Sequence, residues 1–382
     1  MFPFVSSVIY DIMEVQVSGT FVFKRGFLRF SRLRALLLAF ALMECAERSV
    51  GQNQRPGSVD GHGHSYDLDL DAETPGPWYP YPPIVSDEPP TIFIGTSAYR
   101  DERCAKTLFD AFTKAQYPEK VYIGLVDQTG EYDVDCVELY CTMWSEQLQD
   151  DSHCPYRSHI TQLKLDYTKA AGPVKARYLQ QTLINNEEYC LQVDAHSMFV
   201  EDWDVKMVEM WKLANNEMAV LSSYIGNISG YGVNMQGRNE VPTLCNLEWG
   251  HTGGSLKVPR NSIAAAAWAL PRPKLSTLWG AGLSFSKCHA ELNVPYDRYL
   301  PHVFDGEEFS RALRLFTHGY DVYAPHRNYI YHHYMPRGQH RTQWNGDRNY
   351  EVTTAHKRVG EKVEDPKAHF SEQLKRSYTR LR

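Results

Sequence analysis

The chain has 382 residues, 43% of them hydrophobic, which is enough to build one large core or two smaller ones. A net charge of −6 and a pI near 6.2 argue against a nucleic-acid-binding body. Eight cysteines are too few for a disulfide-built scaffold of this length, and the lack of a CxxC pair argues against a zinc knuckle.

Residues 1–50 predict a signal or anchor segment. A basic stretch at 24–34 precedes the apolar run Ala35–Met43, whose nine residues are too few to span a membrane comfortably. Such a run suits a signal-peptide core or a short membrane anchor, although about 34 residues precede it and no A-x-A site follows. We therefore expect a secretory-pathway protein of the Golgi or ER lumen, with a cytoplasmic protein as the alternative.

The next segment, 51–90, holds eight prolines, five glycines and seven acidic residues, which predicts a linker or plain disorder. We expect a folded domain at 91–345 and a polar, basic tail at 346–382. An irregular loop is expected up to about residue 157. Its cysteines form a disulfide in an oxidising compartment or remain free thiols; they are Cys136, Cys141 and Cys154.

Short apolar runs alternate with amphipathic stretches along the domain. This alternation predicts an α/β fold with a mostly parallel sheet covered by helices. In such sheets, ligands bind beyond the carboxyl ends of the strands. Strands are expected at 91–94, 121–126, 159–167, 189–193, 218–224, 278–286 and 321–325, and helices at 105–112, 172–183, 202–213 and 305–320. Residues 225–278 give no clear pattern.

Asp194 and His196 follow the strand at 189–193, and their spacing places both on one side of an extended segment. A carboxylate and an imidazole can form half of a divalent-metal site. The alternative is that Asp194 caps a turn and His196 lies on the surface. His326, His332 or His333 could complete the site, but adjacent strand residues face opposite sides, so only one of the last two can do so.

Two other groups of polar residues carry a functional interpretation beside a structural one. Asp305, Glu307 and Glu308 either stabilise the start of a helix or point into a cleft and bind hydroxyl groups. Arg177 is either solvated or directed at an anionic ligand. After the first strand, the segment GTSAYRD could bind a base by stacking and a phosphate through Arg100.

Several motifs occur together in one order. The ordered set resembles a family of glycosyltransferases that use UDP-N-acetylglucosamine (UDP-GlcNAc), which includes the enzyme that modifies hydroxyproline on Skp1. This resemblance covers about residues 90–345. Its motifs are TIFIGTSAYRDERCAKTLFDAF, GPVKARYLQQTL, EEYCLQVDAHSMFVEDWD, YIYHHY and, most specific, PYDRYLPHVFDGEEFSRALRLFTHGYDVYAP.

The resemblance implies a GT-A fold, distantly similar to the polypeptide N-acetylgalactosaminyltransferases, in which a D-x-H motif and a later histidine bind the metal. By this resemblance, the metal ligands are Asp194, His196 and His332. The uridine site would be formed by Thr96, Tyr99 and Arg100, with Arg177 directed at an anionic part of the donor. Gly280 and the catalytic group Asp305, Glu307 and Glu308 would line the sugar and acceptor pocket.

The resemblance implies transfer of GlcNAc from UDP-GlcNAc to a hydroxyl of a protein or glycan acceptor, with Mn²⁺ or Mg²⁺ as cofactor. The family implies retention of anomeric configuration, and front-face attack assisted by the departing phosphate is the preferred hypothesis. The N-terminal segment and the glycosylation motif Asn227-Ile228-Ser229 suit a secretory enzyme, which puts Skp1 in doubt as the acceptor and makes a secreted or cell-wall glycoprotein at least an equal candidate. The alternatives are another UDP-sugar donor, a non-catalytic lectin-like or scaffold protein, and a metal-dependent hydrolase.

Overall fold

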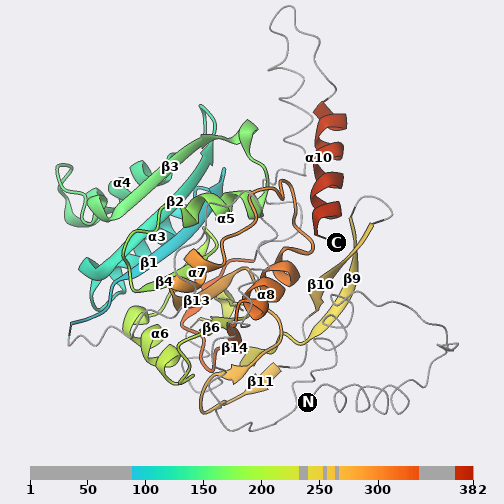
Figure 1. Ribbon diagram of the computed structural model, residues 1–382. Coiled ribbons are helices and arrows are strands. Elements are labelled where there is room, and N and C mark those ends of the chain that lie inside the picture. The colour runs from blue at the N-terminus through green and yellow to red at the C-terminus, as the bar shows by residue number, and fades with distance from the viewer. Residues whose placement is uncertain (1–87, 232–239, 253–255, 263–265, 335–365, 382) are drawn as a thin grey trace, which may run out of the picture. The chain divides into compact units, whose positions relative to one another are not determined.

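A computed structural model describes residues 88–231, 240–252, 256–262, 266–334 and 366–381 (Figure 1). The chain divides into two units after Leu42, and every described residue belongs to the second. The predicted signal or anchor segment and the linker up to residue 87 lie outside the described residues. Within the described ranges, no helix has the length and apolar character required to cross a membrane.

An eight-stranded sheet forms the centre of the fold, and six of its strands run in the same direction. This confirms the predicted α/β class with a mostly parallel sheet. In spatial order, the strands are β12 (Lys274–Leu275), β14 (Asp321–Ala324), β6 (Ala219–Ser222), β13 (Leu283–Lys287), β4 (Tyr189–Val193), β1 (Ile92–Tyr99), β2 (Val121–Thr129) and β3 (Ile160–Asp166).

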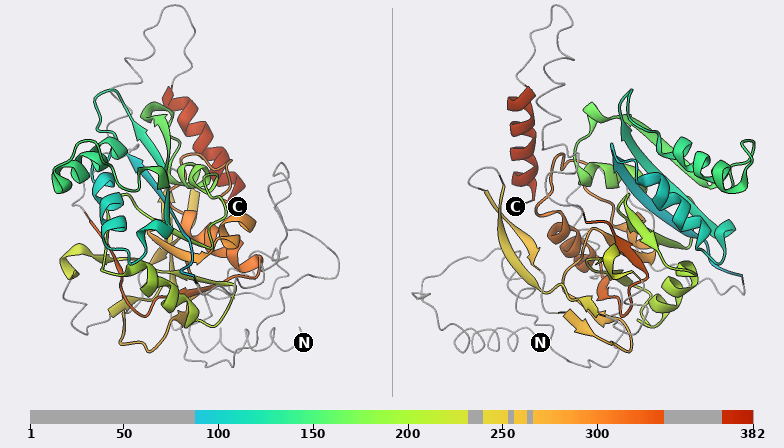
Figure 2. Two further views of the ribbon diagram at one scale, coloured as in Figure 1. Left: turned by 90° about the vertical axis from the view of Figure 1, so that its left-hand side faces the viewer. Right: turned by 180° about the vertical axis from the view of Figure 1, so that it is seen from behind.

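Helices cover both faces of this sheet (Figures 1 and 2), because successive strand side chains point to opposite sides. In β6, Leu221 belongs to one apolar core and Val220 to the other. The first core includes side chains of α3 (Cys104–Thr113), α4 (Cys136–Leu148) and α6 (Trp203–Lys212). The second includes side chains of α5 (Pro173–Gln181), α7 (His289–Asn293) and α8 (Glu307–Thr317).

Smaller sheets occupy the stretch that gave no sequence pattern and the segment near the C-terminus. A three-stranded sheet has the order β5 (Ser197–Phe199), β15 (Ile330–His332) and β7 (Gly226–Asn227). Two antiparallel pairs join β9 (Asn246–Thr252) to β10 (Leu256–Ser262), and β8 (Glu240–Pro242) to β11 (Ala266–Trp268). The AAAAWAL segment therefore contributes β11.

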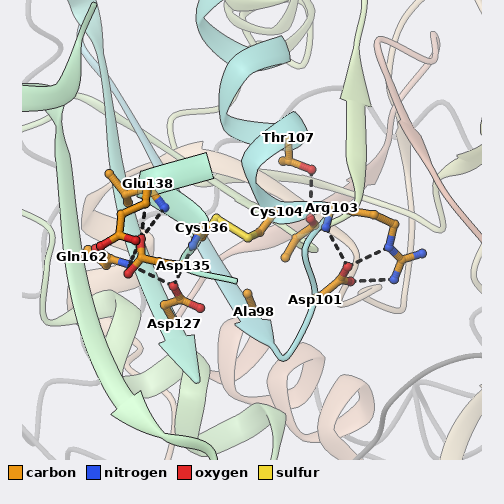
Figure 3. Close-up of a disulfide and its surroundings, with 12 residues drawn as sticks. Ala98, Asp101, Arg103, Cys104, Thr107, Asp127, Asp135, Cys136, Glu138 and Gln162 are labelled. Atoms are coloured by element: carbon orange, nitrogen blue, oxygen red, sulfur yellow. Dashed lines mark hydrogen bonds and ion pairs between the residues drawn. A yellow bond between two sulfur atoms is a disulfide. The ribbon is translucent and has the colours of Figure 1, made fainter. Parts of the chain in front are cut away.

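The predicted loop before residue 157 is wrong in part, because α4 begins at Cys136. Asp135 caps this helix, its Oδ1 accepting hydrogen bonds from the amides of Val137 (2.8 Å) and Glu138 (2.9 Å). Such caps satisfy amides that have no partner within the helix. A disulfide joins Cys136 to Cys104 at the start of α3, beside Asp135 and the Asp101–Arg103 pair (Figure 3).

The remaining described cysteines are also oxidised. Disulfides join Cys141 to Cys154 and Cys190 to Cys288, and Cys245 is disulfide-bonded as well. No described cysteine is free. Of the two states left open by the sequence, the structure therefore has the disulfides, and it pairs Cys136 with a cysteine outside the predicted cluster.

Part of the predicted C-terminal tail is the helix α10 (Pro366–Arg380), which packs on the folded body. Tyr378 is buried in the second core. Ser377 Oγ donates a hydrogen bond to the carbonyl oxygen of Pro301 (2.9 Å), and Arg380 forms an ion pair with Asp297. This helix therefore contacts the loop that leads into α8.

Candidate active site

A cavity of about 950 Å³ opens at the carboxyl ends of the central strands, where parallel α/β sheets bind their ligands. Its lining includes Arg100 after β1, Asp194 after β4, Tyr224 after β6, and Glu307 at the start of α8. This volume lies at the upper end of the range for small-molecule sites. The cavity therefore has room for a ligand as large as a nucleotide sugar.

Asp194, His196 and His332 converge in this cavity, with one potential ligand atom from each lying within 4.8 Å of the others. His332 Nε2 lies 3.1 Å from Asp194 Oδ2, and the two imidazole centroids are 4.4 Å apart. Sheet pairing explains the approach, because β15 pairs with β5 and places His332 opposite Ser197. The structure thus brings together the three residues proposed as metal ligands.

Two residues that the sequence did not single out hold this group in place. Asp101 Oδ2 lies 2.8 Å from Nδ1 of His196 and also forms an ion pair with Arg103. Burial alone would raise the pKa of Asp101, but its contacts with His196 and Arg103 lower it overall. Thr107 Oγ1 accepts a hydrogen bond from the amide of Ser197 at 3.0 Å, and its one hydroxyl proton can go to the carbonyl oxygen of either Ala195 or Ser197, each 3.0 Å away. Asp101 is the last residue of the segment GTSAYRD, but its role depends on tertiary proximity.

Arg177 lies between two carboxylates, and its solvated interpretation is wrong. Nη2 of Arg177 lies 3.0 Å from Asp194 Oδ1, and Nη1 pairs with Glu307 Oε1. Burial alone would lower the pKa of Arg177, but the charges of Glu307 and Asp194 raise it. The guanidinium therefore stays charged and fixes one oxygen of Asp194, while the other faces His332.

Glu308 lies beside this pair and lines the cavity. Its carboxylate accepts hydrogen bonds from the Tyr224 hydroxyl (2.8 Å) and from the Ala281 amide (2.9 Å). Burial and the nearby charge of Glu307 raise the pKa of Glu308 to about 7, despite these hydrogen bonds. Glu308 can therefore change protonation near neutral pH. Asp305 also lines the cavity, just before α8.

At another part of the cavity lining, Tyr99 and Arg100 occur together as the sequence suggested. Arg100 pairs with Asp133 at 2.7 Å, and its guanidinium lies 4.3 Å from the centroid of the Tyr167 ring. Tyr132 also lines the cavity and is 92% exposed, so its ring is available for stacking. Tyr132 and Asp133 were not identified from the sequence, because the segment containing them was interpreted only as an irregular loop.

Two predicted contact residues do not line the cavity. Thr96 is fully buried, since β1 continues to Tyr99 and pairs with β2 beyond the predicted end at residue 94. A side chain at Gly280 would meet the backbone of Ser223 at about 3 Å, so this glycine serves close packing. The lining residues nearby are Ser97, Ala281 and Gly282.

Comparisons with solved structures find several similar glycosyltransferases. GalNAc-T7 with UDP, GalNAc and Mn²⁺ has 11% identity and a TM-score of 0.46, over 66% of this chain and 45% of its own. TarS of S. aureus in complex with UDP-GlcNAc has 14% identity and a TM-score of 0.41, over 76% and 72% of the two chains. The mannosyltransferase PcManGT of Pyrobaculum calidifontis, with GDP-Man and Mn²⁺, has 13% and 0.40, over 68% and 63%.

The chain thus spans less than half of the length of GalNAc-T7. No curated protein matches the chain in sequence. The model of one protein family, described as "Glycosyltransferase (GlcNAc)", matches residues 91–150 and 139–381, which together make up most of the chain. This chain is a member of the Glycosyltransferase (GlcNAc) family.

Proposed function

We propose that this protein transfers N-acetylglucosamine from UDP-GlcNAc to a hydroxyl of a protein acceptor, on a GT-A type fold. The observation that carries the proposal is the convergence of Asp194, His196 and His332 beside Arg177 in the cavity of a family member. The acceptor hydroxyl is that of hydroxyproline, or of serine or threonine.

The chemistry of the three side chains fits a divalent cation. One carboxylate and two imidazoles suit a divalent first-row metal ion, and a diphosphate donor favours Mn²⁺, with Mg²⁺ as the alternative. The Asp101 contact at Nδ1 leaves the other nitrogen of His196 for a ligand, an arrangement common at metal-bound histidines. Nδ1 of His332 is buried and has no hydrogen-bond partner among the described residues. A divalent cation bound by Asp194, His196 and His332 would neutralise charge on the leaving diphosphate.

Side chains of the protein position the reacting groups in this proposal. Arg177 adds a fixed positive charge next to Asp194, and Glu307 holds Arg177 in place. Ionised Glu308 accepts a hydrogen bond from the attacking hydroxyl. The acceptor oxygen bonds to the anomeric carbon, and the bond from that carbon to the diphosphate breaks. The hydroxyl proton passes to the Glu308 carboxylate, which delivers it to the departing phosphate. Attack on the same face retains the anomeric configuration.

This role of Glu308 predicts a pH dependence of transfer. Below pH 7 the carboxyl is increasingly protonated and cannot accept the hydroxyl proton, so kcat/KM should rise as pH increases through about 7. Glu308→Gln should lower kcat/KM by about 100-fold and remove this rise. Glu209→Gln, the same change at an exposed position of α6, should leave the profile unchanged. A pH profile of Glu308→Gln that matches the wild type would refute the role.

Asp101 provides a separate prediction about metal affinity. Asp101→Asn weakens the contact that orients His196 and should reduce Mn²⁺ affinity by about 10- to 100-fold. Excess Mn²⁺ should restore most of the activity, which distinguishes lost affinity from misfolding. Calorimetric titration with Mn²⁺ measures the effect, and the exposed Asp150→Asn is the matched control. Unchanged affinity in Asp101→Asn would contradict the positioning of His196 by Asp101.

One assay tests the proposed function itself. Purified protein is incubated with UDP-GlcNAc and Mn²⁺, with and without a hydroxyproline or a Ser/Thr peptide, and released UDP is measured. UDP release that the peptide stimulates supports the transferase, and a panel of UDP-sugars identifies the donor. Binding of UDP-GlcNAc without turnover would favour the lectin-like alternative. Hydrolysis of a phosphoester without a sugar nucleotide would favour the hydrolase.

We also propose that the protein works in the lumen of the secretory pathway. Its N-terminal segment either anchors it to the membrane or directs it there and is then cleaved. The disulfides Cys104–Cys136, Cys141–Cys154 and Cys190–Cys288 support this location, because disulfides persist mainly in oxidising compartments. The same reasoning favours a secreted acceptor over the cytosolic Skp1.

A further inference from the structure

The segment Asn227-Ile228-Ser229 is the one Asn-X-Ser/Thr motif of the chain, and X is not proline. Strand β7 ends at Asn227, and the 3-10 turn Ile228–Gly230 follows it. Asn227 and Ser229 are exposed, whereas Ile228 packs against the first core. The fold therefore anchors this turn by its middle residue and presents both residues that define the motif to solvent.

The side-chain amide of Asn227 is held in one orientation. Its Oδ1 accepts a hydrogen bond from the backbone amide of Ser229 at 2.9 Å. Nδ2, the atom that carries a sugar in N-glycosylated proteins, donates no hydrogen bond to any described residue. Asn227 is not among the residues that line the cavity, although its neighbour in the sheet register, His332, is. A substituent on Nδ2 would therefore extend into solvent.

We propose that Asn227 carries an N-linked glycan. In this modification, Nδ2 bonds to the anomeric carbon of an oligosaccharide donated by a lipid diphosphate. The bond from that carbon to the diphosphate breaks, the lipid diphosphate leaves, and the amide nitrogen releases a proton. The inference depends on the proposed secretory location and not on the transferase activity. Because β7 is an edge strand, the glycan would also block pairing of this edge with another chain.

The test uses the full chain expressed in a eukaryotic host. Treatment with peptide N-glycosidase should increase gel mobility and convert Asn227 to aspartate, which peptide mass spectrometry detects. Asn227→Gln and Ser229→Ala should remove the glycan, while Ser229→Thr should keep it. Asn186→Gln, at an exposed asparagine outside any motif, should have no effect. An unmodified Asn227 peptide overturns the proposal. If the Cys190–Cys288 disulfide is intact in the same sample, the glycosylation site alone fails. If these cysteines are reduced, the secretory location on which the proposal depends fails with it.

A different observation concerns α10 and the loop at 297–306. Phe304 and Asp305 of this loop line the cavity, while none of the described residues of α10 does. Besides its contacts with Pro301 and Asp297, α10 places Gln373 Oε1 3.0 Å from Nε2 of His302. On the side of the loop away from α10, the backbone amide of His302 donates a hydrogen bond to the carbonyl oxygen of Ala171 at 2.5 Å. Ala171 lies just before α5. The loop is therefore held between α10 and the start of the helix that carries Arg177.

We infer that α10 is a positioning element for the carboxylates at the start of α8. This inference depends on the proposed transferase. Tyr378→Ala, which removes the buried side chain of α10, should lower kcat by about 10- to 100-fold through displacement of Glu307 and Glu308. The KM for UDP-GlcNAc should change by less than kcat does, because the proposed uridine contacts at Arg100 are made elsewhere and only the Arg177 contact depends on Glu307. Tyr378→Phe keeps the buried ring but loses the hydroxyl contact with the backbone of Phe304, so it should restore most but not all of kcat.

The outcomes separate this inference from the proposed function. If the wild type releases no UDP, the function fails. If the wild type is active and Tyr378→Ala is equally active, the positioning role of α10 fails. Parallel losses of kcat and donor affinity in Tyr378→Ala, accompanied by a lower Tm, would indicate a structural role alone.

Discussion

Replacing His196 with alanine is expected to abolish metal-dependent UDP release. The change removes one of three converging side chains and leaves the Asp101 carboxylate without its imidazole partner. Loss of a hydrogen-bond partner of a metal ligand typically costs about 10- to 100-fold, so loss of a ligand should exceed this. The measurement is the rate of UDP release against Mn²⁺ concentration, with and without acceptor peptide.

Two variants make this result interpretable. His153→Ala removes an exposed histidine that is not among the cavity-lining residues and should match the wild type. His332→Ala should resemble His196→Ala, since both remove imidazoles from one site. Full metal-dependent turnover by His196→Ala would show that the residue is not a ligand, and the metal assignment would then be wrong.

A second large effect is expected on stability. Arg177→Met leaves the carboxylates of Asp194 and Glu307 near each other without the cation that joins them. Removing one partner of a buried ion pair typically costs about 3–5 kcal/mol, because the remaining charge stays desolvated. We expect a loss of this size in the free energy of unfolding, measured by chemical denaturation, together with loss of activity.

A double-mutant cycle identifies the cause. Adding Glu307→Gln removes one of the unpaired carboxylates, so the double variant should be more stable than the sum of the single changes predicts. Arg376→Met is the control. It breaks the surface ion pair between Arg376, whose side chain is 77% exposed, and Glu372, and it should cost less than about 1 kcal/mol. Additive effects of Arg177→Met and Glu307→Gln would contradict direct coupling between these residues.

The class of fold could be predicted from the sequence because local patterns encode it. The strand at 189–193 was predicted with its observed ends, since an apolar run there is followed at once by polar residues. The loop up to residue 157 was not predicted correctly, because α4 is stabilised by a cap and two disulfides rather than by a clear apolar stripe. The apolar residues of α4 do not form a continuous stripe, so the sequence pattern did not predict the helix.

The candidate site, too, could be predicted from the sequence only in part. Asp194 and His196 are two residues apart, so an extended segment places them together. His332 lies 138 residues beyond Asp194, and only the pairing of β15 with β5 brings it there, so the sequence needed a family resemblance to select it. Asp101 and the inward direction of Arg177 depend on tertiary contacts, which no local pattern encodes.

The Cys190–Cys288 disulfide has a consequence for how the protein can be prepared. It ties β4, the strand that ends beside Asp194, to the segment after β13, and closes a loop of 98 residues. In the chain-entropy account, a cross-link over about 100 residues restricts the unfolded chain enough to stabilise the fold by about 4–5 kcal/mol. Protein produced in a reducing cytosol would lack this restriction, so an apparently inactive preparation from such a host would report on unfolding and not on catalysis.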